Sequence, residues 1–200
     1  MSRLPAAERR EQLLDCAASI FAEHGYARAT TSQLARAAGV TEPIIYRHFK
    51  SKRDMYIALI ERTGKQTLEQ WKEDLKGATD PADRLRRLIG DNPMVSAQGR
   101  DAYRVFLQAI SEVEDQGIQR AVNEHIASVH GFLTAELERA QAAHRVTAKF
   151  TADILAWLLI DIGMGYGMMS ALKIRNHSID PAGTHVQEVL ARVLVGKGPG

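Results

Sequence analysis

The segment TSQLARAAGVTEPIIYRHF, residues 31–49, carries the clearest chemical pattern in this chain of 200 residues. Gly39 separates two short helical stretches, and glycine adopts the positive φ of a tight turn without strain. Ala35 is small enough for two helices to cross closely. Apolar side chains would hold the crossing angle, namely Leu34, Val40 and Ile45. The pattern predicts a helix-turn-helix, although any pair of short helices joined by a glycine would share it.

Charge is distributed unevenly along the sequence. The whole chain has a formal net charge of +2, but residues 1–53 carry nine Lys or Arg against five Asp or Glu, which gives +4. Residues 54–200 carry 17 basic and 19 acidic side chains, which gives −2. A basic N-terminal quarter indicates an anionic partner such as nucleic acid. A solvated basic surface is the simpler alternative.

At these residues the chain resembles the TetR (tetracycline-repressor-like) family of bacterial transcriptional regulators. The likeness lies in four stretches of residues 8–60, namely IFAEHGY (20–26), TTSQLA (30–35), AGVT (38–41) and IYRHFKSK (45–52). The stretch Thr41-Glu42-Pro43-Ile44 departs from it, because relatives more often carry a serine and small residues there. That departure bears on the sequence preference of the second helix.

The resemblance implies a dimer that places two recognition helices, residues 42–49, in successive major grooves of a palindromic operator. The residues expected at phosphates are Thr31, Ser32, Tyr46, His48 and Lys52, beside the positive end of the fourth helix. The residues expected at base edges are Thr41, Glu42, Pro43 and Arg47. Gln33 completes the set of expected DNA-binding residues.

The rest of the sequence predicts an all-α protein, because apolar residues recur at spacings of three and four residues. The alternating apolar and polar pattern of strands is absent. We expect a three-helix DNA-binding domain over 1–50, joined by a long fourth helix to a helical effector-binding and dimerisation body over 51–200. The helices are expected at 6–24, 31–38, 42–49, 52–76, from 81, 101–115, 117–143, 147–174 and 186–194. A loop is expected at 176–183.

The two longest helices of the body are expected to form the dimer interface, at 117–143 and 147–174. This follows from the resemblance and, in part, from residues 154–172, which are apolar on nearly every side and so must be enclosed. A membrane span of that length is disfavoured because Asp161 falls in its middle. Three glycines at 163, 165 and 167 favour close packing between helices.

A small apolar or aromatic effector is expected to release the protein from DNA, by tilting the fourth helix and changing the separation of the two heads. The side chains predicted to line its pocket are Trp71, Met94, Tyr103, Phe106, Phe132, Trp157, Asp161, Met164 and Met168. For most of these residues ordinary core packing is the alternative, and for Asp161 it is a carboxylate satisfied at a helix interface. Gly64 is a point at which the helix could bend.

Several functions are disfavoured by the residues present. The single Cys16 excludes an internal disulfide, and the seven histidines show no metal-binding spacing, so no metal or other cofactor is expected. No paired acid–base motif supports a helical enzyme. The polar start, without an apolar segment, favours the cytoplasm. A DNA-binding dimer without an effector is the remaining alternative.

Overall fold

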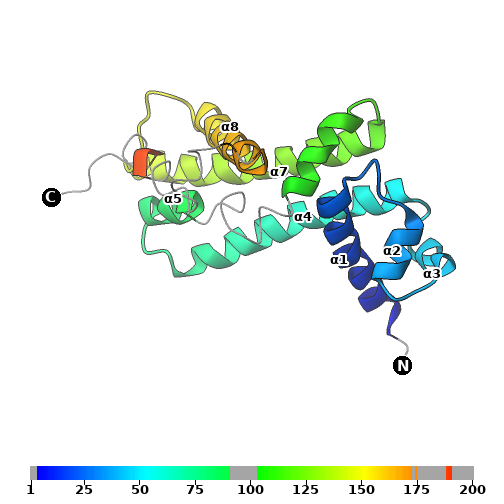
Figure 1. Cartoon of the computed structure of the whole chain (residues 1–200). Coiled ribbons are helices and arrows are strands. Elements are labelled where there is room, and N and C mark those ends of the chain that lie inside the picture. Colours follow the sequence, from blue (N-terminus) through cyan, green and yellow to red (C-terminus); the bar gives the residue numbers. More distant parts are fainter. Residues whose placement is uncertain (1–3, 91–102, 173, 175–187, 191–200) are drawn as a thin grey trace. The chain divides into compact units, whose positions relative to one another are not determined.

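The computed structural model describes residues 4–90, 103–172, 174 and 188–190, and these contain helices and turns but no strand. The α-helices are α1 (Ala6–His24), α2 (Thr31–Ala37), α3 (Glu42–His48), α4 (Lys52–Asp74), α5 (Pro81–Gly90), α7 (Gln116–Ala142) and α8 (Ala152–Ala171) (Figure 1). Two 3₁₀ helices are η1 (Leu75–Gly77) and η2 (Gln108–Glu112). The prediction of an all-α protein with an N-terminal helix-turn-helix is confirmed.

The N-terminal helices begin and end where local signals place them. Helix α1 stops at Gly25, whose φ of +81° takes the chain out of the helix. Helices α2 and α3 each end one residue before the predicted boundary. The predicted helix over 101–115 is instead a short helical stretch at 103–107 followed by η2. The loop predicted at 176–183 lies outside the described residues, and of the predicted last helix only 188–190 are described, as helix.

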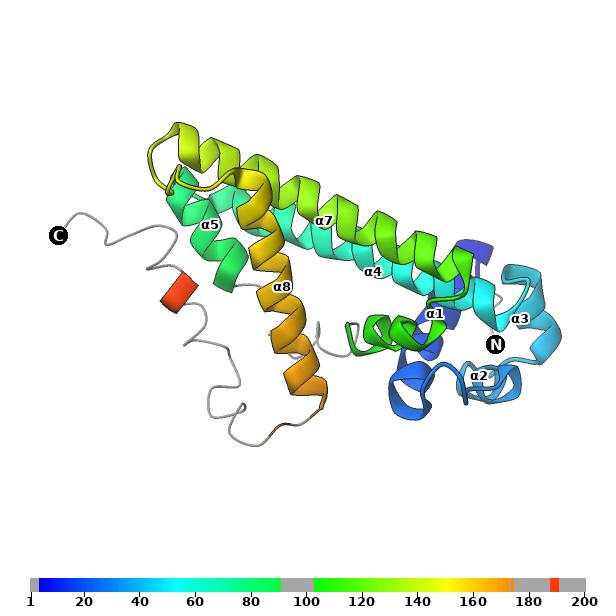
Figure 2. The same ribbon diagram turned by 90° about the horizontal axis from the view of Figure 1, so that it is seen from above.

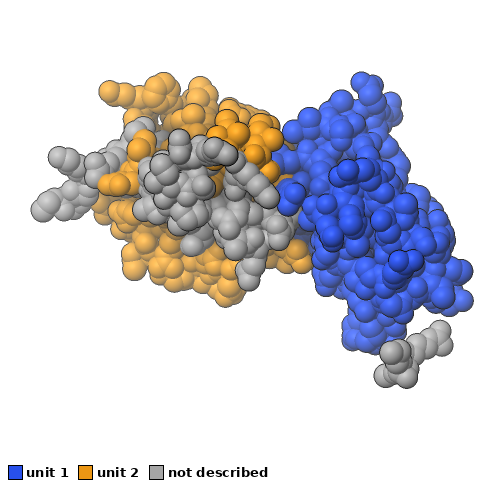
Figure 3. Space-filling view, in the orientation of Figure 1, with its two compact units in different colours: residues 1–63, 104–125 blue, residues 64–103, 126–200 orange. Residues whose placement is uncertain are grey.

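The chain forms two compact units (Figure 3). Unit 1 comprises residues 1–63 and 104–125, and unit 2 comprises residues 64–103 and 126–200. Helices α4 and α7 each run through both units, and the boundary within α4 falls between Thr63 and Gly64. Residues 104–125, which the sequence suggested were part of the body, therefore pack with the N-terminal helices.

Unit 1 has a core of side chains from α1 to α4. The largest fully buried ones are Leu13, Leu14, Phe21, Leu34, Ile45, Phe49, Met55, Tyr56 and Ile60, joined by Ile118 of α7. The rings of Tyr26 and Tyr56 stack at 4.2 Å, and Phe21 meets both edge-on at 5.6 Å. Edge-on and stacked rings of this kind add stability beyond the apolar area that they bury.

Unit 2 is closed by one apolar cluster and a buried ion pair. The cluster joins side chains of α4, η1, α5, α7 and α8, among them Trp71, Leu75, Leu85, Leu133, Leu137 and Leu155. Glu136 is only 3% exposed and accepts two hydrogen bonds from the Arg84 guanidinium, at 2.6 and 2.8 Å. Arg139 also contacts Glu136, and Arg84 reaches the carbonyl of Leu75. A buried carboxylate is tolerated because its oxygens are paired in this way.

Helix α8 begins at Ala152, five residues later than predicted (Figure 2). The connection from α7 is held by Gln141, whose side-chain amide donates to the carbonyls of Thr147 and Phe150. Among the described residues, one helical window, Ala152–Met169, is long and apolar enough to cross a membrane, and 44% of it is buried inside the protein. A core helix passes the same test, so this finding is weak evidence for a membrane.

Candidate nucleic-acid interface

Helices α2 and α3 form the predicted helix-turn-helix. Thr30 caps α2 in a reciprocal capping box, because its hydroxyl accepts from the Gln33 backbone while Gln33 Oε1 accepts from the Thr30 backbone at 2.9 Å. Gly39 has a φ of +64°, as the turn requires. Ala35 and Ile45 are buried, with 5% and 1% exposure. These local features fix α3 against α2 in unit 1.

Helix α3 presents three kinds of surface around its single buried residue, Ile45. At 100° per residue, Pro43 and Arg47 lie opposite Ile45, and both are exposed. Tyr46, 51% exposed, lies on the flank toward α2, where its hydroxyl is 3.5 Å from Thr31 Oγ1. Ile44 and His48 lie on the other flank. The outward face of α3 is therefore exposed, and both flanks are at least partly exposed.

Most residues predicted to bind DNA lie together around α2 and α3 and are at least partly exposed. The exposed ones are Ser32, Gln33, Thr41, Pro43, Tyr46 and Arg47, and the half-buried ones are Thr31, Glu42, His48 and Lys52. Thr41 is the N-cap residue of α3, yet its hydroxyl makes no capping hydrogen bond. The Gln33 amide oxygen is engaged in the capping box, which leaves its NH₂ group for a partner.

Lys52 occupies a position that differs from the predicted one. Its ammonium donates to the carbonyls of Tyr26, Ala27 and Ala29 at 2.8, 3.2 and 3.0 Å, and it lies 4.6 Å from the centre of the Tyr26 ring. An ammonium has three N–H donors. All three are used to hold the turn between α1 and α2, so this geometry opposes the predicted phosphate contact through Lys52.

The start of α4 is capped by its own side chains. Ser51 Oγ accepts from the Asp54 backbone at 3.0 Å, and Asp54 Oδ2 accepts from the Lys50 backbone at 3.0 Å. The negative charge of Asp54 stabilises the positive N-terminal end of α4, a helix of 23 residues. The first turn of α4 is thus fixed in the unit that carries α2 and α3.

Unit 1 also depends on contacts from residues 104–125 that sequence reasoning missed. Gln108 donates its amide to the carbonyl of Phe21 at 2.8 Å and accepts from the backbone of Tyr26 at 2.6 Å. The Tyr56 hydroxyl donates to the carbonyl of Val105 at 2.8 Å. These bonds join positions 49 to 87 residues apart, for which a single sequence carries no local signal.

A bidentate ion pair completes this set of contacts. Arg53 donates to both oxygens of Asp115, at 2.5 and 2.6 Å. Asp115 also accepts from the backbones of Gly117 and Ile118, so it caps α7. The Arg53 bonds, then the bond from Ile118, hold the pKa of Asp115 well below its usual range. A Cβ at Gly117 would lie 2.2 Å from Arg53 Nη2, so only glycine fits there without movement.

The predicted effector-binding residues do not lie on one surface. Trp71, Phe132 and Met164 belong to the apolar cluster of unit 2, and the Trp71 and Phe132 rings stack at 5.7 Å. Tyr103 is buried in unit 2, whereas Phe106 is buried in unit 1. Met94 lies outside the described residues. Of the predicted effector-binding residues, Trp71, Phe132 and Met164 are therefore the ones that share one apolar cluster.

The other three candidates lie on the outer face of α8. Trp157 and Met168 are 43% and 40% exposed, and Asp161 is exposed between them. They share this face with other large apolar side chains, namely Ile154, Leu158, Met169 and Leu172. We call these seven residues the α8 stripe. Within the protomer, the stripe points away from the residues that α8 buries, such as Leu155 and Leu159, so its members do not line a site in the cluster.

Comparison with known proteins agrees with this architecture. Residues 13–59 match the family described as bacterial regulatory proteins of the tetR family. The HTH-type transcriptional activator FasR of Mycolicibacterium smegmatis is 38% identical over 142 residues, which cover 59% of this chain and 65% of that protein. The fatty acid metabolism regulator protein of Bacillus subtilis is 35% identical over 148 residues, which cover 72% and 76%. The chain belongs to the TetR family and is a DNA-binding transcriptional regulator.

Solved structures share the fold over nearly the whole chain. A transcriptional regulator from Saccharomonospora viridis in complex with choline has a TM-score of 0.85 and 23% identity, covering 96% of this chain and all of that one. The regulator FadR from Bacillus subtilis in complex with stearoyl-CoA has a TM-score of 0.75 and 19% identity, covering 94% and 99%. At these identities the likeness concerns the fold alone.

Proposed function

We propose that the protein acts as a homodimer whose two α3 helices read successive major grooves of a palindromic operator. The carrying observation is the outward face of α3, where Pro43 and Arg47 project beside Thr41 and Glu42. In this proposal Arg47 donates to guanine, Glu42 accepts from a cytosine amino group and Pro43 touches a thymine methyl. Thr31, Ser32, Tyr46 and His48 hold phosphates, and the Gln33 NH₂ group lies beside them.

Selection of bound duplexes from a random library tests this reading. We expect two half-sites related by a dyad, with centres one helical turn apart. Arg47→Ala should relax the preference at one base pair of each half-site, at a cost of about 1–3 kcal/mol. Ser32→Ala should instead weaken binding equally on all sequences. An asymmetric selected site, or an unchanged base preference in Arg47→Ala, would contradict the proposal.

We propose that the α8 stripe forms the dimer interface, with the adjoining face of α7. Seven large apolar or acidic residues aligned along one helix face form a contiguous patch of the kind that marks an interaction site. Gly165 lies in the middle of this stripe, and a Cβ there would meet nothing within 4 Å in the protomer. Added bulk at 165 therefore begins in open space in the protomer, and in this proposal it would meet the partner at the interface.

Gly165→Leu should weaken dimerisation and operator binding together, while the dissociated protomer should be no less stable than the wild type, because leucine favours a helix more than glycine does. Gly131→Leu makes the same test on α7, because its Cβ also meets nothing in the protomer. Gln66→Leu, on the exposed surface of α4, is the matched control for an added leucine. Sedimentation at several concentrations gives the dimer dissociation constant. A monomeric wild type at micromolar concentration would contradict the dimer.

We further propose that the effector is a fatty acyl thioester bound in unit 2, which lowers operator affinity and makes the protein a repressor. The fatty acid metabolism regulator protein of Bacillus subtilis suggests the class by its name, and the structure of FadR from the same organism contains stearoyl-CoA. In this chain the Trp71 side chain is 5% exposed, and its indole N–H has no hydrogen-bond partner among the described residues. A buried donor without a partner is costly, and a thioester carbonyl would satisfy it.

Titration of operator complexes with stearoyl-CoA, and with choline as an unrelated ligand, tests the effector. We expect release by the thioester, with a coupling of about 1–3 kcal/mol per protomer. Trp71→Phe keeps an aromatic ring beside Phe132 but removes the N–H, and should weaken the response roughly fivefold. Full operator affinity at saturating ligand would favour a dimer without an effector.

Two broader assignments complete this proposal. The relatives named above are regulators of transcription, and we propose that this chain likewise catalyses no reaction. It would act in the cytoplasm, where bacterial DNA lies. Helices α4 and α7 would couple the ligand in unit 2 to the DNA head, because each helix runs through both units. Purified protein incubated with stearoyl-CoA should leave the thioester intact.

A further inference from the structure

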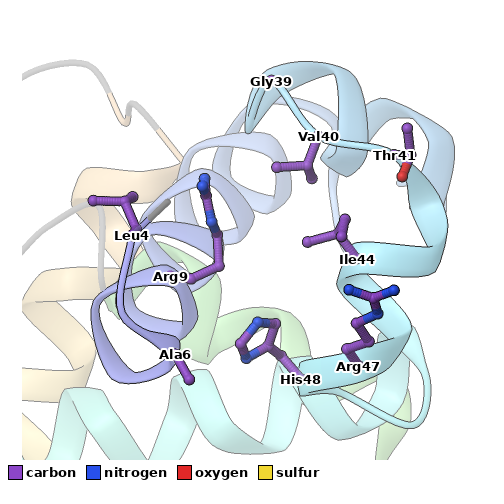
Figure 4. A pocket seen from close by; sticks show the side chains of 9 residues that line it. All are labelled: Leu4, Ala6, Arg9, Gly39, Val40, Thr41, Ile44, Arg47 and His48. Atoms are coloured by element: carbon purple, nitrogen blue, oxygen red, sulfur yellow. The ribbon is translucent and has the colours of Figure 1, made fainter. Parts of the chain in front are cut away.

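A second surface of unit 1 lies along the flank of α3 that faces away from α2. A groove of about 590 Å³ opens there between the start of α1 and the turn before α3 (Figure 4). Nine residues line it: Leu4, Ala6, Arg9, Gly39, Val40, Thr41, Ile44, Arg47 and His48. Six of them belong to the turn and to α3, and the α1 side contributes Leu4, Ala6 and Arg9.

The chemistry of this lining combines an apolar floor with positive charge. Val40 and Ile44 point into the opening from the side of α3, and Leu4 lines its edge on the side of α1 (Figure 4). Arg9 and Arg47 bring guanidinium groups, and His48 adds an imidazole. None of the nine lining residues is acidic. A ligand that fits has an anionic group beside a ring with apolar edges, which describes the phosphate and sugar of a nucleic-acid backbone.

The position of the groove beside α3 indicates which ligand it would bind. A DNA major groove is about 12 Å wide and is bounded by two sugar–phosphate strands. A helix with its side chains is roughly 10–12 Å across, so each flank of a helix seated in the groove faces one strand. One flank of α3 carries Tyr46 beside Thr31 of α2. The opposite flank carries Ile44 and His48, and there α1 supplies the nearby positive charge.

We propose that this groove binds the sugar–phosphate backbone of the DNA strand on the α1 side of α3, and that Arg9 holds one of its phosphates. The inference rests on the proposed placement of α3 in the major groove. One Arg9 nitrogen, Nη1, donates to Gln12 Oε1 at 2.5 Å. That bond orients the guanidinium, and in the described part of the chain its other N–H groups remain available for a phosphate.

The neighbouring Arg10 provides a matched control. Its guanidinium carbon lies 4.8 Å from the centre of the Phe49 ring, and Arg10 does not line the groove. Arg9→Gln and Arg10→Gln therefore remove the same charge from adjacent positions of one helix. Any effect of net charge alone is equal in the two variants. A difference between them reports on the groove.

Operator binding is measured against salt concentration for the wild type and both variants. We expect Arg9→Gln to lower the slope of log K against log salt by about one unit, on the operator and on random duplexes alike. Arg9→Lys should restore most of the slope, because an ammonium also binds phosphate. Arg10→Gln should keep the wild-type slope. Thermal midpoints of all three variants check that unit 1 is folded.

Single methylphosphonate substitutions then locate the phosphate. Neutralising one phosphate per half-site, on the strand at the α1 flank, should weaken the wild type several-fold and leave Arg9→Gln unaffected. An unchanged slope in Arg9→Gln, equal slopes in Arg9→Gln and Arg10→Gln, or the same methylphosphonate pattern in wild type and Arg9→Gln would each overturn the inference. If the wild type itself selects no duplex, the proposed function fails first, which keeps the two failures distinct.

Discussion

The two compact units are closed by different kinds of interaction. In unit 1, long polar side chains supplement the apolar core and reach backbone carbonyls far away in the sequence, as Lys52, Tyr56 and Gln108 do. In unit 2, a large apolar cluster carries the packing, and Arg84 with Glu136 forms the buried polar link. Hydrogen bonds are directional, whereas apolar packing tolerates rearrangement. Unit 1 is therefore built to hold one geometry, which suits a surface that must match a DNA duplex.

The largest effect is expected where unit 2 departs from apolar packing. Arg84→Met removes both bonds to Glu136 and leaves that carboxylate, 3% exposed, with Arg139 as its partner. Breaking a buried pair in this way should cost roughly 3–5 kcal/mol in the free energy of unfolding, measured in urea. Lys76→Met removes an exposed pair with Glu73 and should cost under about 1 kcal/mol. Equal losses of unfolding free energy in the two variants would show that the buried ion pair contributes no more than an exposed one.

A pH dependence should come from unit 1. Burial lowers the pKa of His125 from 6.5 to about 4, and its ring lies edge-on to Phe106 at 4.9 Å. Between these pH values the unfolded chain binds more protons than the folded one, so stability falls as pH decreases from 6.5 towards 4. The loss should reach about 3 kcal/mol at most.

Urea unfolding at several pH values measures this dependence. His125→Gln should flatten the curve between pH 6.5 and 4, because the variant has no proton to bind there. His24→Gln changes a half-buried histidine at the end of α1 and is the matched control for the loss of one imidazole. A steep fall that persists in His125→Gln would assign the dependence to other groups.

A substitution of Lys52 tests how much these polar bonds contribute to the stability of unit 1. Lys52→Met keeps the aliphatic stem but removes the donor to three carbonyls, and should cost about 2 kcal/mol in the free energy of unfolding. Operator affinity should fall with the folded fraction, while the salt slope stays at the wild-type value. A salt slope lowered by about one unit in a fully folded variant would instead restore Lys52 as a phosphate contact.

The smallest effect on stability is expected at the N-cap of α2. Thr30→Ala removes the hydroxyl that accepts from the Gln33 backbone and should cost about 1 kcal/mol. Thr30→Ser keeps the acceptor and should recover most of that loss. Thermal unfolding of both variants gives the comparison, and equal midpoints would mean that the cap contributes little to unit 1.

Local signals made the N-terminal region predictable from sequence. Gly25, Gly39 and the Thr30 cap act within one turn of the residues that they control, so α1 to α3 lie within one residue of expectation. The start of α8 was predicted five residues early, because the Gln141 bonds that hold the connection were not visible in the sequence. Their partners are carbonyls, which every residue has.

The candidate sites were less predictable than the fold. Lys52 looked like a phosphate ligand because it is basic and begins a helix, but its side chain turns to backbone carbonyls. Helix α8 is apolar on nearly every side, so periodicity could not separate its buried face from the stripe that holds Trp157, Asp161 and Met168. Arg9 was not singled out, because its role depends on how α1 lies beside α3.

The path of the chain through the two units limits how such a regulator can be recombined. The chain passes between the units at 63/64, 103/104 and 125/126, so no single cut separates them. A graft of residues 1–50 alone would leave Phe21 and Tyr26 without Gln108. Exchange of DNA specificity between relatives must therefore also carry residues 104–125, or preserve Gln108, Asp115 and Gly117 in the recipient. The DNA-binding unit is thus encoded by two separate stretches of the gene.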